Sequence, residues 1–166
     1  MIQPQRIEPK PGQESVWDYP RPPRLERSLK EIKIVFNEVI IAQSSHAYRI
    51  LETSHPPVYY LPPEDIKLEY LKPVVAHQSF CEWKGKASYY NLQVKEREVV
   101  NVAWCYSQPT EKFATITNYI AFYPSKMDAC YVEGELVTAQ PGDFYGGWIT
   151  EDIVGPFKGT ANSWGW

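Results

Sequence analysis

The chain has 166 residues, of which 43% are hydrophobic and 14% aromatic, and its formal net charge is −3. This length favours one domain with a core of useful size. The charge is mildly negative and forms no long run of one sign, so we predict no general nucleic-acid partner and no anionic-membrane surface. No stretch approaches the ~20 apolar residues of a membrane span. The first residues lack the apolar core of a signal peptide, and we place the protein in the cytoplasm.

Three cysteines, Cys81, Cys105 and Cys130, are spread widely along the chain. Their number is odd and no CxxC pair occurs, so neither a disulfide framework nor a structural zinc site is expected. Free thiols in a reducing compartment are the favoured interpretation. We predict no metal and no cofactor.

Residues 1–28 are Pro-rich and polar, which favours an extended arm with little regular structure of its own. Trp17 and Tyr19 would be costly to leave in water, so we expect them to dock on the domain. A mobile tail is the alternative. The chain therefore divides into an N-terminal arm at 1–28, a β-rich core at 29–139 and a C-terminal arm at 140–166.

The core begins with two β-branched runs, 32–36 and 39–42, on either side of Asn37-Glu38. Two such runs around a two-residue polar link predict a hairpin. Further along, apolar and polar residues alternate over 66–70, which predicts a half-buried strand.

Between these segments, the stretch 48–60 runs YRILETSHPPVYY. Pro56 disfavours helical geometry at His55, and Pro57 has no N–H to give to a ladder. We therefore predict a buried strand, a rigid polar corner and a second strand. Glu52 and His55 lie at that corner, where a carboxylate and an imidazole could meet.

Later strands are predicted where β-branched and aromatic residues alternate between turn signals. No segment keeps a helical period for three turns, so the expected fold is mainly β: a small single-domain antiparallel β-barrel or a two-sheet sandwich with few short helices. The later strands are expected at 89–94, 99–106 and 119–123. A second hairpin is expected from 127–132 and 135–137 across Glu133-Gly134. Short helices are expected only around 27–31 and 110–116.

From Gln140 onwards glycine and aromatic residues alternate. Glycine can pack flat under an aromatic ring, so we expect an ordered C-terminal arm wrapped over the domain. A disordered tail is the alternative, although so many aromatic side chains are unusual in a solvated coil.

Six segments together resemble the DUF427 family, which is also labelled a nucleotidyltransferase-like family. The segments are ESVWDYPRPPRLE, RILETSHPPVYYLPPEDI, CEWKGKASYY, NVAWCYSQP, YIAFYPSKMDACYVEGE and FYGGWITEDIVGPFKG, spanning Glu14 to Gly159. The resemblance implies a small β-rich, barrel-like fold and leaves the function unknown. It also implies which positions the family pattern retains: Glu52, His55, Pro56, Tyr60, Cys81, Lys84, Gly85, Ala87, Tyr90, Trp104, Tyr106 and Tyr123.

The transferase label finds no support in the motifs. A nucleotidyltransferase site usually needs a Gly-Ser turn followed by an Asp-x-Asp pair that holds two metal ions, and this chain has no such spacing. It also lacks a GxxxxGK[ST] phosphate loop and a GxGxxG turn.

The corner and the first cysteine carry the candidate catalytic chemistry. If Glu52 meets His55, the carboxylate would orient the imidazole and raise its pKa, as in an acid–base pair. The alternative is a corner hydrogen bond that only fixes the Pro-Pro turn. Cys81 could act as a nucleophile, with His55 or His77 nearby and Lys84 favouring the thiolate, although a lone cysteine is more often a buried apolar filler.

A group of aromatic side chains offers a candidate binding surface. Strand alternation would place part of the group on one inner face, where a small barrel could enclose a small-molecule pocket. Lys84 at its mouth could meet an anionic group or stack on a ring. Plain core packing is the alternative. The group consists of Trp83, Tyr89, Tyr90, Trp104, Tyr106 and Tyr123.

Three functional hypotheses follow. The first is a protein that binds a small molecule, with Tyr60, Lys84, Tyr90, Trp104, Tyr106 and Tyr123 as binding residues and Glu52 and His55 completing the polar rim. The second is a metal-independent enzyme that uses Glu52 and His55 as acid and base, or Cys81 as nucleophile. The third is an interaction module whose Trp-bearing arms dock a partner or the other subunit of a homodimer.

Overall fold

The computed structural model of the chain describes residues 4–81 and 83–166, with the side chains of Ala76 and His77 outside the described set. The predicted role of His77 beside Cys81 therefore lies outside the described residues. Within the described part of the chain, no helix has the length and apolar character needed to cross a bilayer.

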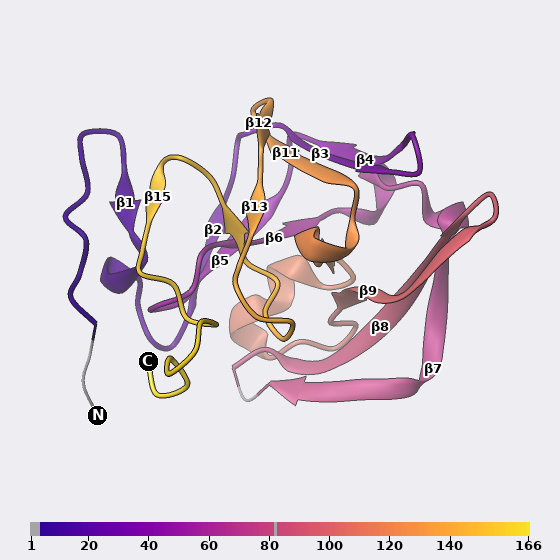
Figure 1. Ribbon diagram of the computed structural model, residues 1–166. Helices are drawn as coiled ribbons and strands as arrows, with labels where there is room; N and C mark the ends of the chain where they lie inside the picture. The colour runs from indigo at the N-terminus through magenta and orange to yellow at the C-terminus, as the bar shows by residue number, and fades with distance from the viewer. Residues whose placement is uncertain (1–3, 82) are drawn as a thin grey trace.

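Two antiparallel sheets dominate the fold (Figure 1). In spatial order, the seven-stranded sheet contains β2 (Arg24–Arg27), β5 (Tyr48–Leu51), β6 (Val58–Leu61), β10 (Ile120–Phe122), β9 (Arg97–Cys105), β8 (Gly85–Val94) and β7 (Leu71–Cys81). The four-stranded sheet contains β12 (Glu135–Leu136), β11 (Ala129–Val132), β3 (Ile32–Phe36) and β4 (Val39–Ser44). Two small pairs complete the strands: β1 (Glu14–Ser15) with β15 (Ile153–Val154), and β13 (Thr138–Ala139) with β14 (Trp148–Ile149).

The two sheets pack face to face around the main core. Side chains from β3, β4 and β11 meet side chains from β6, β8, β9 and β10, and Ile34, Phe36, Leu61, Leu92 and Phe122 are among the fully buried ones. The mainly β prediction is confirmed. Since the large sheet ends in two separate edge strands, β2 and β7, the two-sheet sandwich is the predicted alternative that the structure fits.

Both predicted hairpins are confirmed, and their turns explain why they form. Asn37 and Glu38 between β3 and β4 have φ of 49° and 67°, and Glu133 and Gly134 between β11 and β12 have φ of 50° and 80°. Two successive residues with positive φ are typical of the type I′ turn, whose twist matches that of antiparallel strands.

Two local predictions were wrong. The segment 27–31 is not helical, because Ser28 continues the edge of the sheet by donating its N–H to the Ala47 carbonyl at 2.9 Å. The predicted strand at 66–70 is replaced by η3 (Leu68–Tyr70), because the backbone there bridges to β4 only at Ile66 and Lys67.

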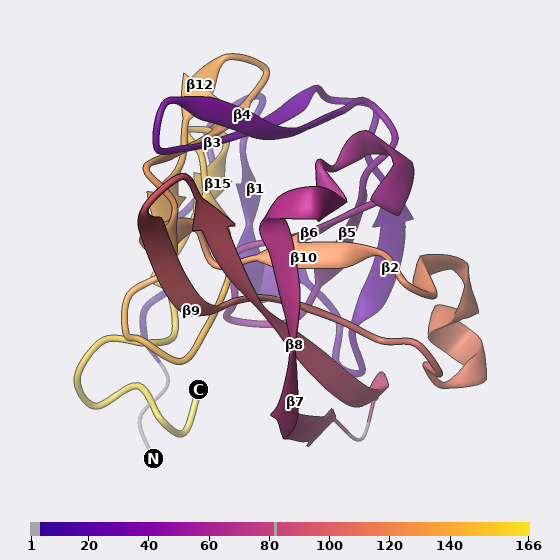
Figure 2. The same cartoon turned by 90° about the vertical axis from the view of Figure 1, so that its right-hand side faces the viewer.

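The second face of the large sheet is covered by short helical turns. η4 (Glu111–Ile116), close to the predicted helix at 110–116, packs Phe113 and Ile116 into the cluster on this face. Figure 2 shows the segment that follows β9 and precedes β10 as short coils beside the sheet. The other helical turns are η1 (Val16–Asp18), η2 (Pro63–Asp65) and η5 (Pro124–Lys126).

The two arms pack against each other and against the corner of β5 and β6. β1 and β15 pair in parallel, so the two arms lie side by side in Figure 1. Trp17 donates its indole N–H to the Pro156 carbonyl at 2.8 Å, and Tyr19 is buried. The predicted docking of these two side chains is confirmed. The boundary predicted at residue 28 stays a prediction, and β2, which precedes it, already belongs to the large sheet.

Candidate functional site

The predicted polar corner connects β5 to β6 and is held by both arms. Thr53 donates its N–H to the Pro20 carbonyl at 3.2 Å, and Ser54 donates its N–H to the Val16 carbonyl at 3.1 Å. On the other side, Lys158 donates its N–H to the Ser54 carbonyl at 2.9 Å. Ser54 is fully buried with φ of 74°, so the corner has a strained backbone that the arms hold in place.

Glu52 and His55 approach each other at this corner without forming a hydrogen bond between their side chains. His55 Nε2 lies 3.6 Å from Glu52 Oε2, which exceeds hydrogen-bonding distance. The turn is closed instead by the backbone, because the His55 N–H donates to the Glu52 carbonyl at 3.0 Å. The structure therefore contains a corner hydrogen bond that fixes the turn, and the acid–base pair stays a prediction.

The rise in the His55 pKa that a contact with Glu52 would cause is not seen, since the two side chains form no hydrogen bond. Burial, together with the positive charges of Lys158, Arg21 and Lys84, lowers the pKa of His55 to about 3. Only 13% of the His55 side chain is exposed, so little water remains to stabilise an imidazolium. The imidazole is therefore neutral at physiological pH, and it faces Glu52 as a polar group and not as a cation.

The C-terminal arm supplies the direct contacts of the His55 ring. Gln140 Nε2 lies 3.0 Å from His55 Nδ1, and the Tyr145 ring meets the imidazole edge to face with centroids 4.9 Å apart. The ammonium group of Lys158 lies 5.8 Å from the centroid of the same Tyr145 ring. From the N-terminal arm, Arg21 donates to the Thr53 carbonyl at 2.9 Å, which holds its guanidinium beside the corner.

The predicted aromatic group gathers largely on one face of the large sheet. We call this set the aromatic cluster; it consists of the buried Tyr60, Trp104 and Tyr106 and the half-buried Trp83, Tyr89 and Tyr123. Trp104 donates its indole N–H to the Tyr60 hydroxyl at 3.1 Å and stacks at an angle on Tyr123, with centroids 4.6 Å apart. Burial raises the pKa of Tyr123 to about 12, so its hydroxyl keeps its proton.

Tyr90 differs from its neighbour Tyr89 because successive residues of a strand point to opposite faces. It packs against the main core, where its hydroxyl lies 3.4 Å from Cys105 Sγ. The structure therefore separates Tyr90 from the other predicted binding residues.

The segment before β14 connects the aromatic cluster to the corner. A Cβ on Gly146 would lie 2.4 Å from Cη2 of Trp104, so the backbone there packs flat on the indole ring. A Cβ on Gly147 would lie 2.6 Å from Pro56 Cγ. Gly146 therefore packs under an aromatic ring, as expected for a glycine of this segment, and the extent of the C-terminal arm stays a prediction.

Lys84 and Cys81 lie between these two groups of residues. The positive charge of Lys84 acts on the His55 imidazole and also partly offsets the rise that burial causes in the pKa of the Tyr106 phenol. Cys81 packs against the aromatic cluster and is half-buried. The charge of Lys84 therefore acts on both the corner and the rings.

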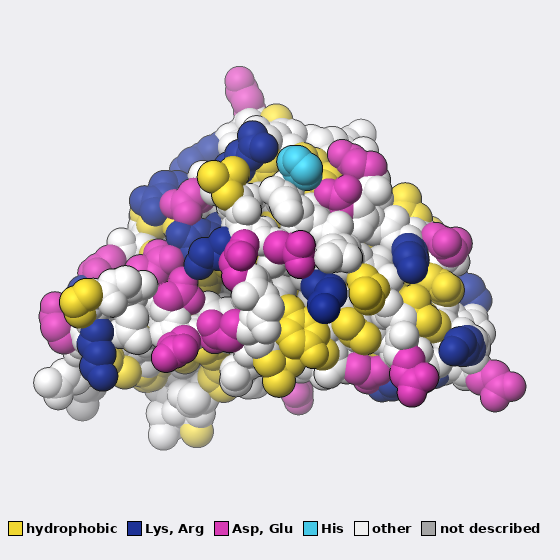
Figure 3. All heavy atoms as spheres, turned by 90° about the horizontal axis from the view of Figure 1, so that it is seen from above, with side chains coloured by type: hydrophobic (Ala, Val, Ile, Leu, Met, Phe, Trp, Pro, Cys, Tyr) yellow, Lys and Arg dark blue, Asp and Glu magenta, His cyan; other side chains and the backbone are white. Residues whose placement is uncertain are grey.

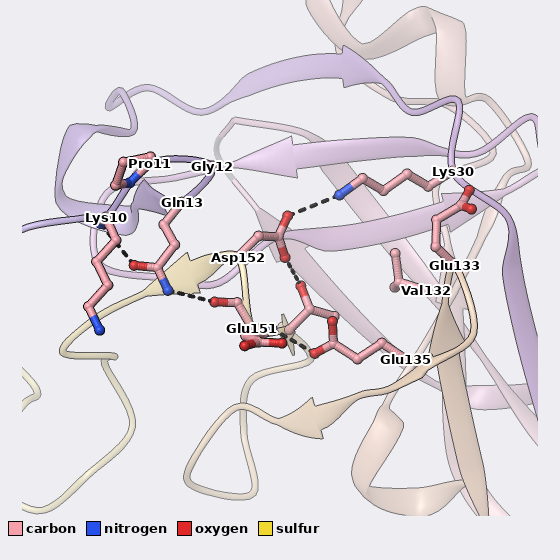
Figure 4. A pocket seen from close by; sticks show the side chains of 11 residues that line it. Lys10, Pro11, Gly12, Gln13, Lys30, Val132, Glu133, Glu135, Glu151 and Asp152 are labelled. Atoms are coloured by element: carbon pink, nitrogen blue, oxygen red, sulfur yellow. Dashed lines mark hydrogen bonds and ion pairs between the residues drawn. The ribbon is translucent and has the colours of Figure 1, made fainter.

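Two hollows in the surface lie elsewhere. The first, of about 520 Å³, lies between the N-terminal arm, the β11–β12 turn and the turn before β15 (Figure 4). Its carboxylates are bonded within the protein: Asp152 pairs with Lys30 Nζ at 2.9 Å, and Glu135 accepts from the Glu151 N–H at 2.6 Å. The second, of about 420 Å³, lies beside β4 and η2. Neither is lined by the site residues predicted from the sequence.

The outer face of the four-stranded sheet carries both signs of charge. Figure 3 shows Lys and Arg side chains mixed with Asp and Glu across that view, with apolar side chains between them. Within residues 4–81 and 83–166, no three His, Cys, Asp or Glu side chains gather as a metal-ligand set.

Sequence reasoning missed the residues that the arms contribute to the corner, namely Arg21, Gln140, Tyr145 and Lys158. The contact from Gln140 to His55 spans 85 positions of sequence, and no local pattern encodes a pairing over that separation. The one available signal was the Gly146-Gly147 pair beside aromatic residues. It indicated that the backbone packs flat on an aromatic ring, but it did not identify the ring.

Comparison with known proteins supports the family resemblance. The family model described as a domain of unknown function (DUF427) matches residues 24–133, which is more than half of the chain. No curated protein matches this chain. The matched region contains the corner and the whole aromatic cluster, whereas Arg21, Gln140, Tyr145 and Lys158 lie outside it.

Proposed function

Because the chain belongs to the DUF427 family, whose function is unknown, we propose a function from its own site: it binds a small molecule that carries an anionic group and a flat ring. The ligand lies at the corner between β5 and β6 and against the aromatic cluster. The observation that carries this proposal is the placement of cations around the largely buried His55: Arg21 donates to the Thr53 carbonyl at 2.9 Å, and the Lys158 ammonium lies 5.8 Å from the centroid of the Tyr145 ring that contacts the imidazole. The positive charges of these two residues and of Lys84 act on the imidazole.

Positive charge concentrated at a partly buried position attracts an anion, because the low local dielectric strengthens the interaction. Glu52 offsets one of the three positive charges, and the Lys158 ammonium also donates to the Trp166 backbone oxygen at 3.4 Å. Arg21 and Lys84 add the positive charge that would attract an anion to the corner. A carboxylate or a phosphate group of the ligand would form charge-assisted hydrogen bonds with Lys84 and Lys158.

The rings supply the second part of the site. Trp83, Tyr89 and Tyr123 are half-buried and present partly open aromatic surface, backed by the buried Trp104. Pockets for small molecules commonly combine such aromatic surface with a few polar groups that fix orientation. Tyr90 lies on the opposite face of the sheet, and we leave it out of the proposed site.

A titration with phenyl phosphate, which carries both a dianion and a ring, tests the proposal. We expect saturable binding by calorimetry, and a loss of roughly tenfold in affinity, about 1.4 kcal/mol, for Lys84→Ala and for Lys158→Ala. Lys67→Ala is the matched control, because Lys67 is exposed beside η3, and it should bind like the wild type. Absence of saturation at millimolar phenyl phosphate, or an equal loss in Lys67→Ala, would contradict the proposal.

A further inference from the structure

We propose that Gln140 is a positioning residue that fixes His55 as the tautomer with its proton on Nε2, so that the corner offers the ligand a hydrogen-bond donor. This inference rests on the proposed function, because it assigns what His55 does at that site. It also identifies an element of specificity that the C-terminal arm contributes.

The orientation of the Gln140 amide is determined by two backbone groups. Gln140 Oε1 accepts from the Gly147 N–H at 3.0 Å, and Gln140 Nε2 donates to the Lys158 carbonyl at 2.9 Å. A backbone N–H can only donate and a carbonyl can only accept, so exchanging the amide oxygen and nitrogen would break both bonds. Gln140 is buried, with 3% of its surface exposed, so water does not offer an alternative.

The second amide hydrogen of Gln140 then faces His55. Gln140 Nε2 lies 3.0 Å from His55 Nδ1, and since the amide nitrogen donates, Nδ1 must accept with its lone pair. A neutral imidazole carries one proton, which is therefore on Nε2. The lowered pKa of His55 agrees with a neutral ring.

The Nε2–H group keeps its capacity to donate to a ligand. Its nearest carboxylate oxygen, Glu52 Oε2, is 3.6 Å away, which is beyond hydrogen-bonding distance. The charged and titratable groups around the ring are Glu52, Lys158, Arg21, Lys84 and Tyr145. Apart from the Glu52 carboxylate, these groups are cations or hydrogen-bond donors, so a donor on Nε2 complements them in holding the acceptor oxygens of an anion.

The residues that set this chemistry lie outside the region that the family model matches. Gln140 and Lys158 follow residue 133, where the match ends, and Arg21 precedes residue 24, where it begins. His55 belongs to the matched region. The arms of this chain therefore set the tautomer of His55 and supply two of the three cations around it, whereas Lys84 and Glu52 come from the matched region.

The wild-type protein itself provides the first test. The chain has only three histidines, so two-bond ¹H–¹⁵N spectra can resolve each ring. We expect the His55 Nδ1 shift of an unprotonated nitrogen and the Nε2 shift of a protonated one at neutral pH. A ring protonated on Nδ1, or two tautomers in comparable amounts, would overturn the proposal without any variant.

Gln140→Glu provides the second test, because a carboxylate at this position can only accept, which requires a proton on His55 Nδ1. We expect Nδ1 to become protonated and the affinity for phenyl phosphate to fall at least fivefold. Gln43→Glu is the matched control, since Gln43 is exposed and the charge change is the same. An Nδ1 that stays unprotonated in Gln140→Glu would overturn the proposal.

The two proposals can fail separately. A wild-type Nε2–H tautomer that moves to Nδ1 in Gln140→Glu, without phenyl phosphate binding in either protein, would support the positioning role and defeat the proposed function. The other outcome is that Gln140→Glu binds phenyl phosphate normally although its His55 is protonated on Nδ1. That result would leave the proposed function standing, but it would show that Gln140 does not set ligand specificity and so would defeat this inference.

Discussion

The largely buried, neutral His55 should make the protein sensitive to mild acid. In the unfolded chain the imidazole takes a proton below its ordinary pKa of 6.5, whereas in the folded protein burial and neighbouring cations lower that pKa to about 3. Between these two values the unfolded state binds more protons than the folded state, so stability falls as the pH falls. The loss is complete only below the folded-state pKa.

The size of the effect follows from the shift. Each pH unit below 6.5 lowers the free energy of unfolding by about 1.36 kcal/mol until the folded-state pKa is reached. Lowering the pH from 7 to 5 should therefore lower it by about 2 kcal/mol through His55 alone. At pH 5 the unfolded carboxylates are still largely ionised, so those that are stabilised in the fold, such as Asp128 and Asp152 with their lowered pKa, contribute little in this window.

The assay is urea unfolding of the wild type and of His55→Asn at pH 7 and at pH 5. Asparagine can still accept from Gln140 and does not titrate, so groups other than His55 cancel in the comparison. The wild type should lose about 2 kcal/mol more than His55→Asn between the two pH values. A difference below about 0.5 kcal/mol would refute the reasoning, because it would mean that the folded imidazole protonates near its ordinary pKa.

Three further predictions concern the packing of the arms and the reactivity of the thiols. Gly146→Ala should destabilise the protein by about 1–3 kcal/mol in urea unfolding, because the added Cβ overlaps the Trp104 ring; unchanged stability would mean that the arm does not pack flat there. Arg49→Met should lower the free energy of unfolding by about 1–3 kcal/mol and speed proteolysis of the N-terminal arm, because it leaves the carboxylates of Glu14 and Glu26 without their cation. An unaltered cleavage rate would contradict this. Cys81 should be alkylated well before the two buried thiols when each site is followed by mass spectrometry, and simultaneous labelling of all three would contradict the burial pattern.

Much of the fold could be predicted from the sequence because it depends on short-range patterns. The link Asn37-Glu38 between β-branched runs specifies a hairpin locally, and so does Glu133-Gly134. The alternation at 66–70 misled because only its first apolar residue, Ile66, is buried, whereas Leu68 in the helical turn is exposed. There the contact from Ile66 to β4 decided the backbone, and such a contact depends on tertiary packing.

The candidate site could be predicted only in part. Pro56 and Pro57 indicated a rigid corner, and the sequence placed Glu52 and His55 on it correctly. The protonation of His55 could not be deduced, because it depends on burial and on cations from distant segments. The separation of Tyr90 from Tyr89 follows from strand alternation, but which of the two faces the aromatic cluster depends on the register of β8 against β9.

A crystal structure of the protein with phenyl phosphate bound tests the central claim most directly. The account predicts the phosphate group within hydrogen-bonding distance of His55 Nε2 and of the ammonium groups of Lys84 or Lys158, with the phenyl ring against the aromatic cluster. A phosphate bound only in the hollow beside Asp152, or no density at the corner under saturating conditions, would contradict it.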